Sequence, residues 1–211
     1  MLIEHEGHVP QVHPSARVAP NATLCGDVVI GPNWSIGFGA VLVAESGPVR
    51  LGANCVVMDT AVLRGVRAAP LTLGDNVLVG SRAHLTGCTV EDEAFLATGA
   101  TVFNGARVGR GAEVRINGVV HLRTALPAGA VVPLGWVAVG DPAQILPPDQ
   151  HDAIWAVQKP LDFPRHVFGV ERPPEGQTIM PEVMPRYARA LVRRHGTDRE
   201  LGGASIPGAA P

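Results

Sequence analysis

His84 is the side chain of this sequence with the widest chemical repertoire. An imidazole can act as a general base, for example in acyl transfer, or as a metal ligand. The hydroxyl of Thr86 follows two residues later, and the carboxylates of Glu45 and Asp59 precede it. His84 and Glu45 are therefore candidate catalytic residues. The sequence equally allows His84 to be a surface or interface histidine without a chemical role.

Two further sets of reactive residues have a plainer interpretation. Three histidines near the N-terminus do not follow the spacing of a metal-binding motif: His5, His8 and His13. Three cysteines lie far apart and form no CxxC pair: Cys25, Cys55 and Cys88. Because their number is odd and their spacing is wide, we expect reduced thiols in a cytoplasmic protein.

The elements that must position these side chains are predicted by a six-residue apolar repeat. The repeat comprises Val12, Val18, Leu24, Ile30, Ile36, Leu42, Leu51, Val57, Leu63, Leu73, Val79, Leu85, Val90, Leu96, Val102, Val108, Val114, Val120, Leu126 and Val132. A period of six fits neither an amphipathic helix nor a single alternating strand. It is typical of an all-β solenoid in which each hexad forms one side of a triangular coil. We expect about six to seven coils over residues 9–140.

Three irregularities in the repeat predict where loops leave the coil. The step from Leu42 to Leu51 is nine residues and that from Leu63 to Leu73 is ten, so loops should lie within 43–50 and 65–72. The step from Leu85 to Val90 is one residue short, which predicts a tight corner at 87–88. The two loops should be neighbours in space, and loops on a rigid scaffold often carry function.

The composition changes after the repeat, and we divide the chain accordingly. An N-terminal segment, 1–8, precedes the β-helix domain, 9–146, and a helical and proline-rich extension, 147–200, leads to a disordered tail, 201–211. Within the extension we expect a helix over 149–159 that is capped by Asp149 and ended by Pro160. Residues 160–185 should be extended, and a second helix should run from 185 or 186 to His195.

Composition also limits the partners and the compartment. The net charge of −2 argues against nucleic-acid binding by the whole chain. Four arginines lie on the second expected helix, and we interpret them as a solvated face rather than a nucleic-acid surface: Arg186, Arg189, Arg193 and Arg194. The sequence shows neither a signal peptide nor an apolar run that could span a membrane. We therefore expect a cytoplasmic location and no membrane partner.

Four segments resemble the γ-class carbonic anhydrases. They are ESGPVRLG (45–52), NCVVMD (54–59), LGDNVLVG (73–80) and HLTGCTV (84–90). The segment VAVGDPA (137–143) is similar to an ending shared by bacterial hexapeptide proteins. The resemblance spans about residues 9–155 and includes both loops and the short corner. It implies a left-handed parallel β-helix of hexapeptide repeats, a homotrimer with zinc between subunits, and a C-terminal helix packed along the coil.

The same resemblance implies that the metal site is lost. The positions of the three zinc-binding histidines hold Arg64, Ser81 and Thr86. A guanidinium repels a dication, and neutral hydroxyls are poor zinc ligands. Around this vestigial site, Val43 and Met58 replace an arginine and a glutamine, whereas Glu45 and Asp59 keep carboxylates. We therefore expect no cofactor, and we expect positions 64, 81 and 86 to meet around one spot where Arg64 pairs with Glu45 or Asp59 and supports the trimer.

Three functions remain open. The first is a homotrimeric scaffold or small-ligand-binding protein that does not hydrate CO2, with an unknown ligand. The second is a hexapeptide acyltransferase that uses acyl-CoA, with His84 as base. The third is a metalloenzyme with rearranged ligands that include His84. If the protein is an enzyme, it should be a lyase of the carbonate dehydratase type or an acyltransferase.

Overall fold

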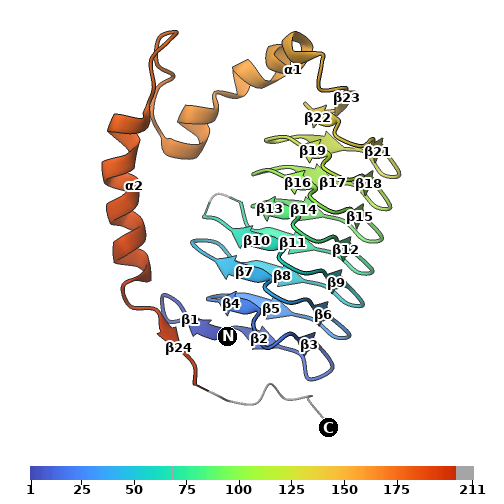
Figure 1. The fold of residues 1–211 in the computed structure, drawn as a ribbon, viewed down its shortest axis with the longest axis vertical. Coiled ribbons are helices and arrows are strands. Elements are labelled where there is room, and N and C mark those ends of the chain that lie inside the picture. Colours follow the sequence, from blue (N-terminus) through green and yellow to red (C-terminus); the bar gives the residue numbers. More distant parts are fainter. Residues whose placement is uncertain (68, 203–211) are drawn as a thin grey trace.

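The chain forms a parallel β-solenoid followed by a helical extension, as the computed structural model shows for residues 1–67 and 69–202 (Figure 1). The strands make one ten-stranded and two seven-stranded sheets, which are the three sides of the coil. This confirms the predicted solenoid of hexapeptide repeats. The first sheet holds eight parallel strands, one from each turn, so the coil is longer than the six to seven turns expected.

The strands of each sheet are neighbours in space but not in sequence. The first sheet has the order β23 (Gln144–Leu146), β22 (Val137–Val139), β19 (Val119–Val120), β16 (Thr101–Val102), β13 (His84–Thr86), β10 (Val62–Gly65), β7 (Val41–Ala44), β4 (Thr23–Cys25), β1 (Leu2–Glu4) and β24 (Arg199–Glu200). The second has β2 (Gln11–Val12), β5 (Val28–Ile30), β8 (Val49–Leu51), β11 (Leu71–Leu73), β14 (Thr89–Val90), β17 (Arg107–Val108) and β20 (Ala125–Leu126). The third has β21 (Val131–Val132), β18 (Glu113–Val114), β15 (Phe95–Leu96), β12 (Leu78–Val79), β9 (Val56–Val57), β6 (Ser35–Ile36) and β3 (Arg17–Val18).

The repeated aliphatic residues form the core by stacking on their equivalents one turn away. In the first sheet, Leu42, Leu63 and Leu85 are in register and have no exposed surface. Burying each such side chain contributes about 1.5–3 kcal/mol. The core therefore depends on short-range repetition, which is why the six-residue period predicts it.

Close contacts between turns explain the glycines that follow inward residues. A Cβ added at Gly31 would lie 1.8 Å from the carbonyl oxygen of Gly52 on the next turn. Asparagine occupies several corners in the left-handed region, with φ of 57° at Asn33 and 58° at Asn76. Asparagine tolerates this region better than most residues.

The two interruptions of the repeat lie side by side, as predicted, although they are shorter than expected. Strands β7 and β10 continue to Ala44 and Gly65, so the loops cover only 45–48 and 66–70. The backbone N–H of Arg67 in the second loop donates to Oγ of Ser46 in the first at 3.0 Å. The short corner is made by Gly87, with φ of +50°, and by the buried Cys88.

The helical extension differs in detail from its prediction. Helix α1 (His151–Gln158) begins after Gln150 without a side-chain cap, so Asp149 is not the cap, and a 3₁₀ turn (Lys159–Leu161) continues through Pro160. Residues expected to be extended contain a π-helical turn (Pro164–Phe168). Helix α2 (Met180–His195) starts earlier than predicted and includes Pro185. The proline removes one hydrogen bond within the helix, and Val183 is the buried residue of the helix.

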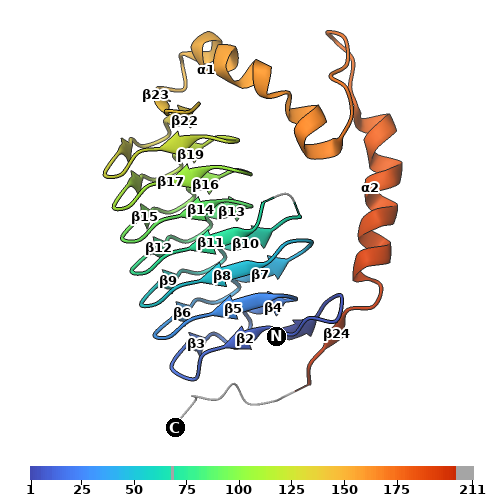
Figure 2. The same cartoon turned by 180° about the vertical axis from the view of Figure 1, so that it is seen from behind.

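The two ends of the described chain meet at one end of the solenoid. Strand β1 pairs in parallel with β4, so the N-terminal segment 1–8 begins the coil rather than preceding it. Helix α2 runs alongside the coil and leads to β24, which pairs antiparallel with β1 (Figure 2). Beyond Gly202 the expected tail lies outside the described residues. Within the described ranges no helix combines the length and the apolarity needed to cross a bilayer.

Candidate functional site

The first sheet brings Arg64 and Thr86 together. Strand β10 pairs with β7 on one side and with β13 on the other, which places Arg64 between Val43 and Thr86 in register. All three residues follow an inward leucine or its equivalent, so they share the outer face of the sheet. The predicted neighbourhood of positions 64 and 86 is therefore present within one chain.

Arg64 is tied to a buried carboxylate. Its Nη1 donates to Oε2 of Glu45, whose side chain is only 6% exposed. The other oxygen of Glu45, Oε1, lies 3.7 Å from Nη1 of Arg194 on α2. Glu45 thus lies between two guanidinium groups, which offset the cost of removing its charge from water.

Of the two carboxylates expected as partners of Arg64, only Glu45 takes that role in the described chain. Asp59 lies at the corner after β9, where its Oδ1 accepts a hydrogen bond of 2.7 Å from the backbone N–H of Phe38. Met58 precedes it at the same corner and is 42% exposed. These two residues therefore belong to a different side of the coil from Arg64.

Ser81 is also separated from Arg64 and Thr86 within one chain. It lies at the corner between β12 and β13, where the chain enters the first sheet, whereas Arg64 and Thr86 lie where their strands leave it. Positions 64, 81 and 86 therefore do not all meet within the described chain, and their meeting around one spot stays a prediction. A neighbouring copy would have to supply the serine.

His84 and Thr86 form a hydrogen-bonded pair on the outer face of β13. Oγ1 of Thr86 lies 2.9 Å from Nε2 of His84. Burial, and then the charge of Arg64, lower the pKa of His84. The imidazole is thus neutral at pH 7, and its Nε2 can accept the threonine hydroxyl proton. A hydroxyl held by a neutral imidazole and flanked by a cation resembles the nucleophile and base of an acyl-transfer site.

The residues at these positions do not fit a zinc ion. Zinc requires deprotonated N, S or O ligands in a tetrahedral arrangement. Arg64 presents a cation whose charge is engaged by Glu45, and the hydroxyl of Thr86 is engaged by His84. On this face only the imidazole of His84 could serve as a zinc ligand. Among its contacts in the described chain, no other side chain could serve as a second ligand.

Burial raises the pKa of all three cysteine thiols. Burial raises the pKa of the Cys88 thiol to about 12. Burial and the neighbouring Asp198 carboxylate raise that of Cys25 to about 11. All three cysteines are buried and free. None therefore supplies a thiolate nucleophile at neutral pH.

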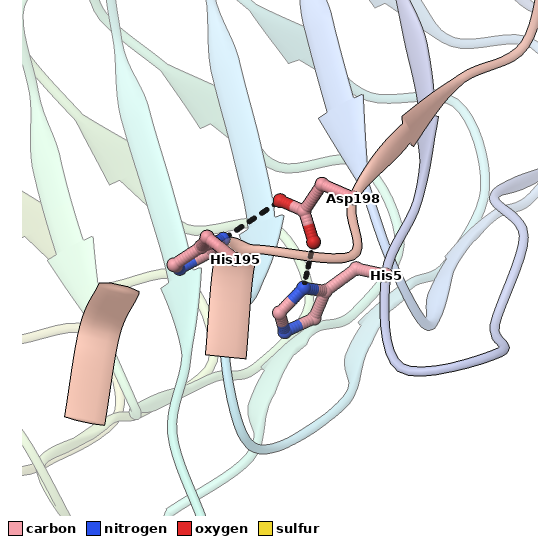
Figure 3. Close-up of side chains that lie close together, drawn as sticks. All are labelled: His5, His195 and Asp198. Atoms are coloured by element: carbon pink, nitrogen blue, oxygen red, sulfur yellow. Dashed lines mark hydrogen bonds and ion pairs between the residues drawn. The ribbon is translucent and has the colours of Figure 1, made fainter. Parts of the chain in front are cut away.

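A second polar cluster was not predicted from the sequence. The rings of His5 and His195 both point toward the carboxylate of Asp198 (Figure 3). Their Nδ1 atoms lie 2.6 Å and 2.8 Å from its two oxygens. The pairing of β24 with β1 brings these residues together, and no local pattern signals contacts between the two ends of a chain.

Comparisons with known proteins agree with the coil of hexapeptide repeats. A profile described as the hexapeptide repeat of succinyl-transferase matches residues 70–104. The chain is 36% identical over 143 residues to gamma carbonic anhydrase 1 of Arabidopsis thaliana, a match that covers 65% of this chain and 50% of the plant protein. It is 30% identical over 141 residues to the carnitine operon protein CaiE of Salmonella agona, covering 67% and 68%.

A solved structure supports the same fold. A Bacillus cereus protein provisionally named an acetyltransferase superposes with a TM-score of 0.56 at 26% identity, covering 74% of this chain and 90% of its own. The fold and the site define a hexapeptide-repeat β-solenoid protein. The chain belongs to the γ-carbonic-anhydrase-like family of such proteins. It spans about half the length of the plant relative that it matches.

Proposed function

We propose that this protein is a homotrimeric γ-carbonic-anhydrase-like scaffold or small-ligand-binding protein that does not hydrate CO2. The observation that carries the proposal is the ion pair between Arg64 and Glu45. It puts a satisfied positive charge at a position where the resemblance expects a zinc ligand. Without a metal-bound water of lowered pKa, the hydration reaction lacks its nucleophile.

The trimer is supported by an apolar row on the third sheet. Val56, Leu78 and Phe95 are neighbours in register on its outer face. Val56 is 38% and Phe95 is 41% exposed. A contiguous apolar surface on a folded protein marks an interface.

We also propose a cytoplasmic location for this protein. The three free thiols support it, because thiols stay reduced in the cytoplasm.

The catalytic part of the proposal is tested by CO2 hydration in a stopped-flow assay with added zinc. We expect the wild-type protein to leave the uncatalysed rate unchanged. The triple variant Arg64→His, Ser81→His and Thr86→His restores the three zinc-binding imidazoles. It should hydrate CO2 faster than the wild type if the loss of these ligands alone abolished the activity. Zinc-dependent hydration by the wild type that Thr86→Val abolishes would contradict the proposal.

A second candidate function is acyl transfer, which the His84–Thr86 pair favours. The neutral imidazole would accept the proton of an acceptor hydroxyl or amine as that group attacks the carbonyl carbon of an acyl thioester. The C–S bond then breaks, and the imidazolium returns the proton to the leaving thiolate. The likeness to the Bacillus cereus structure supports this alternative. Thermal shift with coenzyme A separates the two: a concentration-dependent rise in the unfolding temperature that His84→Ala lowers would favour acyl transfer over a scaffold.

A further inference from the structure

We propose that His5, His195 and Asp198 form a binding site for a divalent first-row metal ion such as Zn²⁺ or Co²⁺. One donor atom from each residue lies within 4.8 Å of the other two. Two imidazole nitrogens and a carboxylate oxygen are ligands that these ions prefer. The site is distinct from the positions at which relatives are expected to bind zinc.

The position and ring orientation of His5 favour metal binding. The residue is 2% exposed, and its Nε2 lies 3.1 Å from the backbone carbonyl oxygen of Glu45. The Nε2–H donates to this carbonyl oxygen, and Nδ1 faces the Asp198 carboxylate, so a metal ion at Nδ1 would replace the hydrogen bond between these two side chains. Metal-binding histidines commonly have such a partner on the second nitrogen, which fixes the tautomer and the ring orientation.

The other two ligands are constrained by the end of α2. His195 is the last residue of the helix, and its ring stacks on that of His5 with centroids 4.7 Å apart. Asp198 follows within three residues and accepts hydrogen bonds from both histidines.

Only a small rearrangement would admit the ion. Ligand atoms about 2.0–2.2 Å from a tetrahedral zinc are about 3.3 Å from one another. The observed separations of 2.6 Å and 2.8 Å are somewhat shorter, so the carboxylate must move outward. Asp198 lies in the short link between α2 and β24 and its side chain is 21% exposed, which leaves room for this shift. Three protein ligands leave a coordination position for water.

The charges around the site favour a cation over an anion. Arg194 lies beside the cluster, but it is engaged by Glu6 at 3.4 Å and by Glu45 at 3.7 Å. When Asp198 and Arg64, the other partner of Glu45, are included, these groups carry a net charge of −1, which offsets half of the charge of a divalent ion. His5 directly follows β1 and His195 ends α2, so the ion would link two segments that lie far apart in the sequence. It should therefore stabilise the contact of the helical extension with the coil, as any ligand does that binds only the folded state.

The test is a Co²⁺ titration of protein stripped with a chelator, followed by visible absorption. We expect ligand-field bands that saturate at one ion per chain and that Zn²⁺ displaces. Asp198→Asn and His195→Gln retain polar groups and should weaken binding at least about tenfold. Zn²⁺ should raise the unfolding temperature of the wild type but not of these variants, whose folding is checked by circular dichroism.

Two controls locate the site. His151→Ala removes a histidine whose side chain is 80% exposed and should leave the titration unchanged. Thr86→Val alters the family position at a residue that contacts none of the three proposed ligands and should also leave it unchanged, so this result is independent of the hydration assay. Absence of the bands in the wild type, or their persistence in both ligand variants, would overturn the proposal and leave a purely hydrogen-bonded cluster.

Discussion

At the residue scale, the outer face of β10 and β13 is governed by one fixed charge. Arg64 cannot lose its proton at any physiological pH, so its field acts on every neighbour that titrates. Its effect on Glu45 is attraction, and its effect on His84 is repulsion of the imidazolium. The same side chain therefore stabilises a buried carboxylate and keeps a nearby imidazole neutral.

Removing this charge should raise the pKa of His84. In Arg64→Met the repulsion disappears and only the effect of burial remains, so the pKa moves back toward the ordinary value of about 6.5. Histidine proton resonances followed by NMR as a function of pH report the change. Arg107→Met, which alters an arginine on the second sheet, is the control and should leave the pKa of His84 unchanged. A pKa of His84 that is identical in Arg64→Met and the wild type would contradict this account.

The sign of the linked stability follows from the same shift. Because the folded chain holds the pKa of His84 below that of the unfolded chain, the unfolded state binds more protons between the two values. His84 therefore lowers stability as the pH falls through this window and has no effect above it. In Arg64→Met the folded and unfolded pKa values of His84 lie closer together. His84 should therefore contribute less to the loss of stability at low pH.

At the scale of elements, the short corner between β13 and β14 fits against the second loop. Gly87 has φ of +50°, and a Cβ there would lie 2.7 Å from the carbonyl oxygen and 2.8 Å from the Cβ of Ala69. The corner, which is one residue shorter than the repeat, thus requires a left-handed backbone at Gly87. It also requires that no side chain at Gly87 extends toward Ala69. The corner and the loop consequently depend on each other.

Gly87→Ala should destabilise the protein more than a matched glycine that only has positive φ. Gly111 has φ of +64° and open space around its Cβ position, so Gly111→Ala carries the backbone cost alone, about 1–2 kcal/mol. Gly87→Ala adds the clash, about 1–3 kcal/mol more. Urea unfolding of both variants measures the difference. Equal losses of stability would show that the loop moves away freely.

The sequence predicts the elements that depend on neighbouring residues and misses those that depend on distant ones. The stacked leucines, both loops and the Gly87 corner follow from spacing, because each turn repeats the same local geometry. The pairing of β24 with β1 joins segments almost 200 residues apart in the chain, as in the contact of His5 with Asp198. No local pattern encodes it, so the cluster of two histidines and an aspartate became visible only in the structure.

Proline placement illustrates the same limit. A proline commonly marks the first turn of a helix, so the sequence predicts that the second helix starts near Pro185. The helix instead begins at Met180, because Pro181 already occupies the first turn and Val183 is buried. Tertiary packing here outweighs a local rule.

At the scale of the whole molecule, the first sheet ends in antiparallel strands, whereas the third sheet has an exposed apolar face. The antiparallel strands β23 and β24 lie at the two edges of the first sheet, where they end the parallel stacking of its turns. The third sheet instead exposes the row of Val56, Leu78 and Phe95. The exposed face of the third sheet is therefore suited to a closed assembly of few copies.

A charge placed in that row should dissociate the assembly without unfolding the chain. We expect the wild type to sediment as a trimer of 22.0 kDa chains and Phe95→Glu to sediment as a monomer, because a carboxylate facing apolar side chains in the interface would be desolvated without a partner. Val9→Glu alters an equally exposed apolar residue, 44% exposed and outside the third sheet, and should remain trimeric. Since the core leucines face inward, both variants should keep the wild-type circular dichroism spectrum. If the wild type is monomeric, or if Phe95→Glu remains a trimer, this row is not the interface. In that case this interface gives no support for a contact between Ser81 of one copy and Arg64 of another.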